Sequence, residues 1–152
     1  MNFLNQMELK GKRVFVRVDF NVPIEDGVIQ DDSRIKAALP TLKYILQNGA
    51  SLVICSHLGK PKGKVKPELS LKPVSERLAE LLNQEVNFAK DCIGEEVRSL
   101  VHGLGARQVV LLENLRFHEQ ETTNDSDFSR KLADMGDIYV NDAFGMAHRA
   151  HA

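Results

Sequence analysis

Polar and basic side chains in this 152-residue sequence follow directly after short apolar runs. Four of the five expected strands are followed in this way: by Asp19 and Asn21 after the first, by His57, Gly59 and Lys60 after the second, by Asn114, Arg116 and His118 after the fourth, and by Asn141, Asp142, His148, Arg149 and His151 after the fifth. In a parallel α/β sheet these positions converge at one edge, where ligands bind. Because arginine presents a planar fork that matches carboxylate and phosphate groups, the sequence predicts a site for a small anion.

Two further arginines, Arg17 and Arg34, lie within expected secondary structure rather than after it. Arg17 falls inside the first expected strand, where a buried ion pair and a ligand contact are equally consistent with its position. Arg34 stands in the segment DDSRI at an expected helix start. Its spacing favours an ion pair with Asp31 or Asp32, so spacing alone does not assign Arg34 to the anion site.

The histidines and Lys60 also admit other interpretations. His57 and Lys60, in the segment SHLGKP, could form loop surface, although Gly59 and Pro61 beside them indicate a defined backbone path. His148, Arg149 and His151 could surround a metal, but an arginine between two ligands argues against that. The shared location of these residues, rather than any one of them, predicts the anion site.

Glycine-rich nucleotide motifs are absent from the sequence. Neither Gly-x-Gly-x-x-Gly nor Gly-x-x-x-x-Gly-Lys-Ser/Thr occurs, and residues 102–105 (HGLG) are too short and precede an expected strand. We therefore expect no nucleotide cofactor and no metal to bind to this chain.

The composition is that of a soluble globular protein. Hydrophobic residues make up 43% and charged residues 27%, and the formal net charge of −1 indicates neither nucleic-acid nor membrane-surface binding. No apolar run approaches the roughly 20 residues of a membrane span, and the first residues lack the pattern of a signal peptide. The two cysteines show neither a disulfide framework nor metal-ligand spacing. We expect a cytoplasmic protein with reduced thiols.

Short β-branched runs alternate with helical patterns along the chain. The expected strands are residues 13–18, 51–56, 85–88, 108–113 and 137–141, and the expected helices are residues 33–47, 71–83, 93–102 and 126–135. Three of the strands are apolar at nearly every position, as in a parallel sheet covered on both faces. The pattern predicts one domain over residues 1–152, a three-layer α/β/α sandwich with a mainly parallel, doubly wound, Rossmann-like sheet.

Four segments depart from this alternation. Asp26-Gly27 predicts a small hairpin after the first strand. Pro40 should kink the first helix or end a short first piece of it. Residues 60–70 are rich in Lys, Pro and Gly and indicate a mobile basic loop. Residues 142–152 show neither a closing helix nor a strand, so we expect the chain to be cut short.

Five segments resemble, in order and spacing, signature segments of the phosphoglycerate kinase family. They are VRVDFNVP (16–23), DDSRI (31–35), SHLGKP (56–61), LLENLRFHEQE (111–121) and NDAFGMAHRAHA (141–152). Enzymes of this family have two domains and move a phosphoryl group between the acyl phosphate of 1,3-bisphosphoglycerate and ADP, with Mg²⁺. The resemblance implies that this chain is the amino-terminal half, that its partner is 3-phosphoglycerate or 1,3-bisphosphoglycerate, and that the protein is a monomer. Mg-ADP or Mg-ATP would bind a missing carboxy-terminal domain, so the chain alone should not turn over.

The resemblance, carried over motif by motif, also implies a set of substrate contacts. The residues are Asp19, Phe20, Asn21, Arg34, His57, Leu58, Gly59, Lys60, Arg116 and Arg149, with Arg17 and His151 as secondary members of the basic patch. Arg34 resembles the family's catalytic arginine, which lies against the transferring phosphoryl group. Phosphoryl transfer needs positioning and charge stabilisation more than a covalent nucleophile, and this set can supply both.

Two residues depart from the family's pattern. Lys60 stands where arginine is usual, which keeps the charge but loses the bidentate fork, and Met146 stands where threonine is usual. Two other readings of the function stay open. A stand-alone anion- or glycerate-binding module would show the same patch, and a dinucleotide-dependent oxidoreductase would share the fold class but needs the missing glycine motif.

Overall fold

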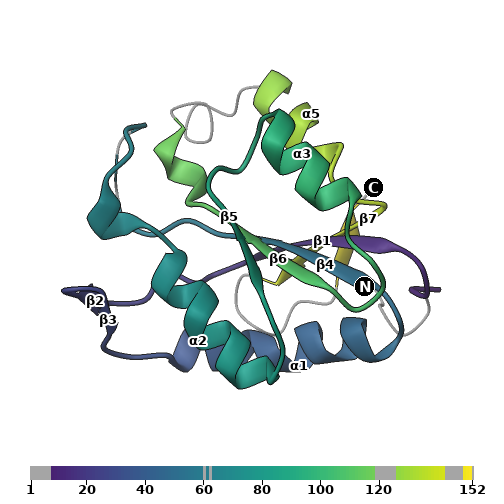
Figure 1. The fold of residues 1–152 in the computed structure, drawn as a ribbon, viewed down its shortest axis with the longest axis horizontal. Coiled ribbons are helices and arrows are strands. Elements are labelled where there is room, and N and C mark those ends of the chain that lie inside the picture. The colour runs from purple at the N-terminus through teal and green to yellow at the C-terminus, as the bar shows by residue number, and fades with distance from the viewer. Residues whose placement is uncertain (1–7, 60, 62, 119–125, 143–148, 152) are drawn as a thin grey trace.

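A largely parallel sheet forms the centre of the molecule. The computed structural model describes residues 8–59, 61, 63–118, 126–142 and 149–151. The main sheet has the strand order β5-β6-β4-β1-β7-β8 (Figure 1). Its strands are β1 (Arg13–Val18), β4 (Ser51–Cys55), β5 (Asn87–Ala89), β6 (Val109–Leu112), β7 (Ile138–Asp142) and β8 (Arg149–His151). All neighbouring strands pair in parallel except β7 and β8, which are antiparallel.

Two pairs of helices cover the two faces of the sheet. Figure 1 shows α1 (Ser33–Gln47) and α2 (Lys72–Leu82) on one face, and α3 (Glu95–His102) and α5 (Ser126–Ala133) on the other. From β1 the chain runs through α1, β4 and α2 to the edge strand β5. It then returns through α3, β6 and α5 to β7 on the other side of β1. This arrangement confirms the predicted three-layer, doubly wound α/β fold. No helix among the described residues is long and apolar enough to cross a membrane.

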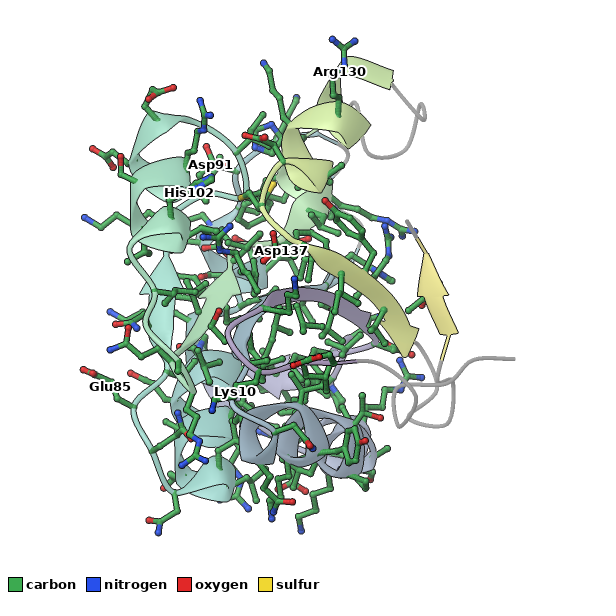
Figure 2. All side chains as sticks on the ribbon, turned by 90° about the vertical axis from the view of Figure 1, so that its right-hand side faces the viewer. Lys10, Glu85, Asp91, His102, Arg130 and Asp137 are labelled. Carbon is green, nitrogen blue, oxygen red and sulfur yellow. The ribbon has the colours of Figure 1, made fainter. Side chains whose placement is uncertain are left out.

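Alternate residues of β1 enter two separate hydrophobic cores. Val14 and Val16 belong to the core beneath α1 and α2, where Leu42 packs, and Phe15 belongs to the core beneath α3, where Val97 packs. Both β4 and β6 are buried at every position, because they lie in the middle of the sheet and face a helix layer on each side. Figure 2 shows charged side chains such as Glu85 and Arg130 on the outside of these layers.

The predicted hairpin is confirmed. Strands β2 (Ile24–Glu25) and β3 (Val28–Ile29) pair antiparallel across Asp26 and Gly27. Both turn residues have positive φ, 50° and 77°, as a type I′ turn requires. The backbone N–H of Gln30 donates to the carbonyl of Pro23 at 2.8 Å and closes the base of the hairpin.

Two segments differ from part of what the sequence predicted. Of the two effects predicted for Pro40, a kink or an early helix end, the second is excluded, because the first helix continues through Pro40 to Gln47. Pro40 and Lys36 are both exposed, so water can satisfy the Lys36 carbonyl that the proline leaves without a helical donor. Residues 149–151 form a strand, although we expected none there; the unpaired edge of β7 supplies hydrogen-bonding partners that local sequence patterns do not reveal.

The close approach of Gly136 to β1 gives a test of the packing between α5 and the sheet. A Cβ at Gly136 would lie 2.7 Å from Phe15 Cβ and 3.2 Å from the Phe15 nitrogen. We expect Gly136→Ala to lower the free energy of unfolding by about 1–3 kcal/mol in urea denaturation, because backbone or core must shift. Gly105→Ala is the matched control, since its nearest neighbour would be Gln108 Oε1 at 3.5 Å. Equal stability of the two variants would contradict this account.

Candidate anion-binding site at the carboxyl ends of the strands

Loops far apart in the sequence meet where the parallel strands end. Residues 19–23 follow β1, residues 56–61 follow β4 and residues 113–118 follow β6, and these three strands are close neighbours in the sheet. The sheet order therefore brings together most of the residues that the sequence assigned to the anion site. Lys60, Met146 and His148 lie outside the described residues.

The loop after β1 is hydrogen-bonded to the loop after β4. Asn21 Oδ1 accepts from the backbone N–H of Gly59 at 2.9 Å, and Ser56 Oγ accepts from the backbone N–H of Phe20 at 2.9 Å. Gly59 has a φ of 63°, and a Cβ there would meet Leu69 Cδ2 at 2.8 Å, so this position favours glycine. Phe20 and Leu58 are 0% and 3% exposed, so their side chains anchor the loops in the core. Only their backbone could reach a ligand.

Asn114 joins the loops after β4 and β6. Its Oδ1 accepts from the backbone N–H groups of Leu58 at 3.2 Å and Arg116 at 3.0 Å. Its Nδ2 donates to the carbonyls of Leu58 at 2.8 Å and Leu69 at 3.0 Å. The side chain is 1% exposed, so these four bonds replace water around a buried amide. Asn114 therefore fixes the backbone on which Arg116 stands.

Glu113 secures the segment that leads into α2. Its carboxylate accepts from Ser70 Oγ at 2.6 Å and from the backbone N–H of Leu71 at 2.8 Å. It also accepts from the backbone N–H of Asn114 at 2.9 Å. The expected mobile loop 60–70 thus contains a short 3-10 turn, Pro67–Leu69, that is hydrogen-bonded to the end of β6.

Arg34 bonds to the loop after β1 and not to the aspartates beside it. Its Nη1 donates to Asp19 Oδ1 at 3.2 Å and to the carbonyl of Asn21 at 2.9 Å. The spacing argument for an ion pair with Asp31 or Asp32 was therefore wrong. The side chain of Arg34 is 54% exposed, so it is held in place at the surface of the site.

Both neighbouring aspartates have other partners. Asp31 Oδ1 accepts from the backbone N–H of Ser33 at 2.9 Å and from its hydroxyl, and these bonds lower the pKa of Asp31. Asp32 Oδ2 accepts from Arg77 Nη2 at 2.8 Å and Nε at 2.9 Å, and this pairing lowers the pKa of Asp32. Asp32 occupies the N-cap position of α1 without a side-chain cap bond, so its role is to tie the start of α1 to α2.

Strand pairing places Arg17 and Arg149 in one row of the sheet. Arg17 of β1 pairs with Cys55 on one side and Asn141 on the other, and Asn141 pairs with Arg149 of β8. The two arginine backbones are thus two strand spacings apart, about 10 Å. Arg17 is half-buried. His151 pairs with Tyr139, two residues farther from the carboxyl edge, so its backbone lies behind the row that contains Arg149.

The remaining predicted cations lie on the same edge. Arg116 is half-buried in the 3-10 turn Leu115–Phe117, and its carbonyl accepts from the backbone N–H of Gly63 at 3.2 Å. His57 is half-buried directly after β4. Cations from β1, α1 and two loops therefore share one end of the sheet, as the rule for parallel sheets predicts. Such an arrangement can bind and orient a small anion.

Local sequence patterns did not reveal the residues that build this frame. Asn114 was predicted only as one polar residue among many at the strand ends, and Ser56, Glu113 and Arg77 were not predicted to take part. The available signal was the dipeptide Glu113-Asn114 directly after a fully apolar strand, because polar side chains that enter a core must find hydrogen-bond partners there.

Comparisons with known proteins agree with one another. A model of the family described as phosphoglycerate kinase matches residues 4–152. The chain is 53% identical over 157 residues to phosphoglycerate kinase of Clostridium botulinum (strain Eklund 17B / Type B), covering 99% of this chain and 40% of that protein. It is 59% identical to the Arabidopsis thaliana protein named phosphoglycerate kinase 3, cytosolic, over 98% of this chain and 37% of that one. The crystal structure of phosphoglycerate kinase from Pyrococcus horikoshii OT3 superposes with a TM-score of 0.85 at 37% identity, covering 98% of this chain and 38% of that chain.

Removal of the Asn114 amide tests whether it holds the site loops. Asn114→Ala leaves buried backbone groups of Leu58 and Leu69 without partners, so we expect the free energy of unfolding to fall by about 2–4 kcal/mol in urea denaturation. Asn48→Ala is the control, because Asn48 is exposed and donates one bond, to the Tyr44 carbonyl at 2.7 Å. We expect that change to stay within about 0.5 kcal/mol. A similar small effect at Asn114 would show that the loops do not depend on it.

The Asp32–Arg77 pair should make the free energy of unfolding depend on pH. The pKa of Asp32 in the folded protein lies below its usual value of 3.8. The contribution of the ionised Asp32 carboxylate to the free energy of unfolding is therefore present above pH 3.8, and it is lost as the pH falls through the pKa of Asp32 in the folded protein. We expect Asp32→Asn to be less stable than the wild type at pH 7, and the difference to shrink below pH 3.8, in urea denaturation at several pH values. In an Arg77→Met background the Asp32→Asn effect should be much smaller; an unchanged effect would disprove the pairing.

Proposed function

The chain belongs to the phosphoglycerate kinase family, and we propose that it supplies the 3-phosphoglycerate-binding side of that enzyme. The reaction is the reversible transfer of a phosphoryl group between 1,3-bisphosphoglycerate and ADP, giving 3-phosphoglycerate and ATP in glycolysis. The enzyme is a kinase, a phosphotransferase with a carboxyl group as acceptor. The chain spans about 40% of the length of the curated relatives it matches, so we propose that residues 1–152 act as the amino-terminal substrate domain and are inactive alone.

One observation carries this proposal: Arg34 is held beside the loop after β1 by Asp19 and the Asn21 carbonyl. Within the described part of the chain both bonds come from Nη1, and a guanidinium carries five N–H donors in all. Arg34 can therefore keep its position while it faces an anion. A cation held in this way beside a transferring phosphoryl group would contribute roughly 4–7 kcal/mol, by analogy with arginine fingers worth about 10³–10⁵ in rate.

The other basic residues divide the remaining work. We propose that Arg116, Arg149 and His57 bind the distal phosphate and the carboxyl group of 3-phosphoglycerate, with Lys60, Arg17 and His151 adding charge. Asp19 and Asn21 would bind the substrate hydroxyl or hold the arginines. Phe20, Leu58 and Gly59 would contribute through the backbone. A loose phosphoryl-transfer transition state needs positioned positive charge, which these residues can provide without a covalent nucleophile.

The Mg-nucleotide of the family does not fit the described residues. Mg²⁺ is held mainly by carboxylate, carbonyl and water oxygens. The described group that could hold a metal ion, Asp91, Cys92 and His118, offers one carboxylate beside a thiol and an imidazole. We therefore propose that Mg-ADP or Mg-ATP binds outside this chain, and we assign no step of nucleotide chemistry to these residues.

We also propose a cytoplasmic monomer as the setting of the enzyme. Its substrates are small soluble anions, and a basic patch on a single subunit can bind them. Neither nucleic acid nor a membrane is needed as a partner. The relative from Arabidopsis thaliana is described as cytosolic, in agreement with this setting.

Calorimetric titration of 3-phosphoglycerate into the folded chain tests the proposal. We expect saturable binding that salt weakens, because dissolved ions screen the attraction between the anionic ligand and the basic residues. Arg116→Ala should weaken binding by about 10- to 150-fold, the loss of a charge-assisted bond worth about 1.5–3 kcal/mol. Arg34→Ala should weaken it less, since we place Arg34 against the transferring group rather than the bound phosphate.

Arg98→Ala is the matched control for these variants. Arg98 is an exposed arginine of α3 that pairs with Asp134 at 3.2 Å, away from the site loops. Its replacement should leave 3-phosphoglycerate binding unchanged. Equal binding by Arg98→Ala and Arg116→Ala would show that the ligand binds elsewhere. Binding without any activity in a longer protein that includes the natural continuation of the chain would favour a non-catalytic anion-binding module.

A further inference from the structure

A second group of ligand-type side chains lies at the ends of β5 and β6. Asp91 and Cys92 follow β5, and His118 follows the 3-10 turn after β6. One ligand atom from each of the three lies within 4.8 Å of the others, and His118 Nε2 is 2.6 Å from Asp91 Oδ1. We propose that Asp91, Cys92 and His118 form a binding site for one borderline transition-metal cation of the Zn²⁺ type. The site shares the loop after β6 with the candidate anion site, but it uses none of the residues that we propose as substrate contacts and does not rest on the proposed function.

The geometry is close to that of a bound metal. Zn²⁺ ligand bonds of about 2.0–2.3 Å in a tetrahedron place neighbouring ligand atoms about 3.5 Å apart. The Asp91–His118 pair must therefore open by about 1 Å, and the other two pairs, each within 4.8 Å, need to close by no more than about 1.3 Å. Rotation of the partly exposed Asp91 and His118 side chains, 50% and 24% exposed, can accomplish this without moving the buried Cys92.

The ligand chemistry selects the class of metal. A thiolate and an imidazole favour Zn²⁺ and its neighbours over Mg²⁺ and Ca²⁺, which prefer oxygen alone. Binding replaces the Cys92 thiol proton with the metal and releases that proton to solvent. Three protein ligands leave a fourth position for water. The sequence did not indicate this site, because its ligands come from segments brought together only by the pairing of β5 with β6.

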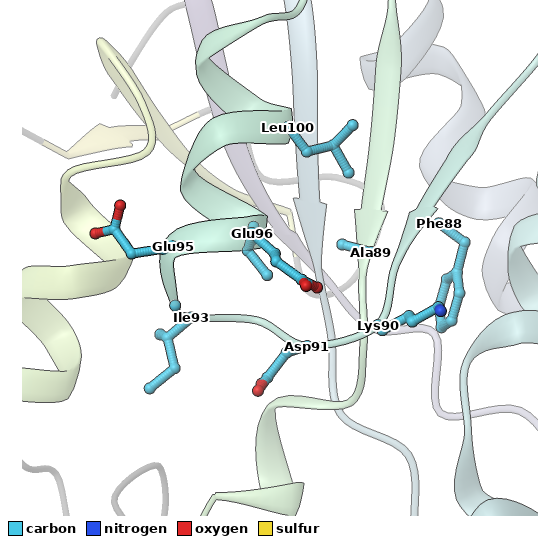
Figure 3. Close-up of a pocket in the computed structure, with 10 residues that line it drawn as sticks. Phe88, Ala89, Lys90, Asp91, Ile93, Glu95, Glu96 and Leu100 are labelled. Carbon is cyan, nitrogen blue, oxygen red and sulfur yellow. The ribbon is translucent and has the colours of Figure 1, made fainter.

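Two features around the cluster support a cation there. The backbone N–H of Cys92 donates to Asp91 Oδ1 at 2.7 Å, which orients the carboxylate as metal sites require. Asp91 also lines a cavity of about 380 Å³ together with Glu95, Glu96 and Lys90 (Figure 3). The carboxylates outnumber the lysine, so the approach to Asp91 attracts cations.

Occupancy would couple this cluster to the loop that carries Arg116. His118 is two residues after Arg116, and a shared cation would tie that loop to the end of β5. A ligand that binds only the folded state stabilises it by mass action. Metal binding should therefore raise the unfolding midpoint whether or not 3-phosphoglycerate is present.

The test is a Co²⁺ titration of untagged, chelator-treated protein, followed by Zn²⁺ competition. We expect one Co²⁺ per chain with a thiolate-to-cobalt absorption band, displacement by Zn²⁺, and a higher thermal midpoint with Zn²⁺. Cys92→Ala and His118→Gln should abolish the band or weaken binding at least about tenfold. His118→Gln keeps the proposal testable if loss of the buried thiol impairs folding.

Matched controls come from residues of the same types. Cys55 is also a buried free cysteine and His102 is an exposed histidine, so Cys55→Ala and His102→Gln should retain both the band and the thermal shift. No thiolate band in folded protein, or an unchanged Zn²⁺ shift in Cys92→Ala and His118→Gln, would overturn the proposal. The three side chains would then form only a hydrogen-bonded cluster.

Discussion

The buried amide of Asn114 holds three separate backbone segments in one arrangement. A primary amide removed from water is costly unless its donors and acceptor are paired, and here the pairing partners are Leu58, Leu69 and Arg116. The loops after β4 and β6 cannot move apart without leaving these groups unsatisfied in the core. The bond from Gly59 to Asn21 extends the same constraint to the loop after β1. The geometry of the proposed anion site therefore follows from hydrogen bonds beneath it rather than from the cations themselves.

This division between a buried frame and exposed cations has a physical reason. Burying an arginine costs several kcal/mol of desolvation, whereas burying a neutral amide with all its bonds made costs little. Arg34 and Arg116 stay partly in water, and their backbone positions are set by neutral or paired groups below them. A backbone that is ordered before the ligand arrives also loses less conformational entropy when the ligand binds. A chain with a net charge of −1 can in this way present a local basic surface.

The sequence predicted the sheet, the helix layers and the hairpin because each depends on a local pattern. Apolar runs, helical spacing and the Asp26-Gly27 turn each depend on a few residues that are close together in the sequence. The partner of Arg34 was mispredicted because it depends on the three-dimensional arrangement: Asp31 bonds back to Ser33, Asp32 pairs with Arg77, and Arg34 bonds to Asp19. The strand at residues 149–151 was missed for the same kind of reason, since the edge of β7 induces it. The position of these residues at the strand ends could be predicted, but their hydrogen-bond and ion-pair partners could not.

Asp19 places a negative charge inside the proposed anion site, and its bond to Arg34 explains how such a site can tolerate it. A long side chain loses about 0.5–1.5 kcal/mol of rotamer freedom when a ligand fixes it. Arg34 is already fixed by Asp19 and the Asn21 carbonyl, so that loss precedes ligand binding. The Asp19 carboxylate weakens the long-range attraction of an anionic ligand to the basic residues. Salt screens that attraction beyond about 8–10 Å in any case. Arg34 is therefore a cation whose guanidinium is already oriented. For phosphoryl transfer this orientation matters more than the net charge of a site, because hydrogen-bond donors that need no reorganisation stabilise the transition state.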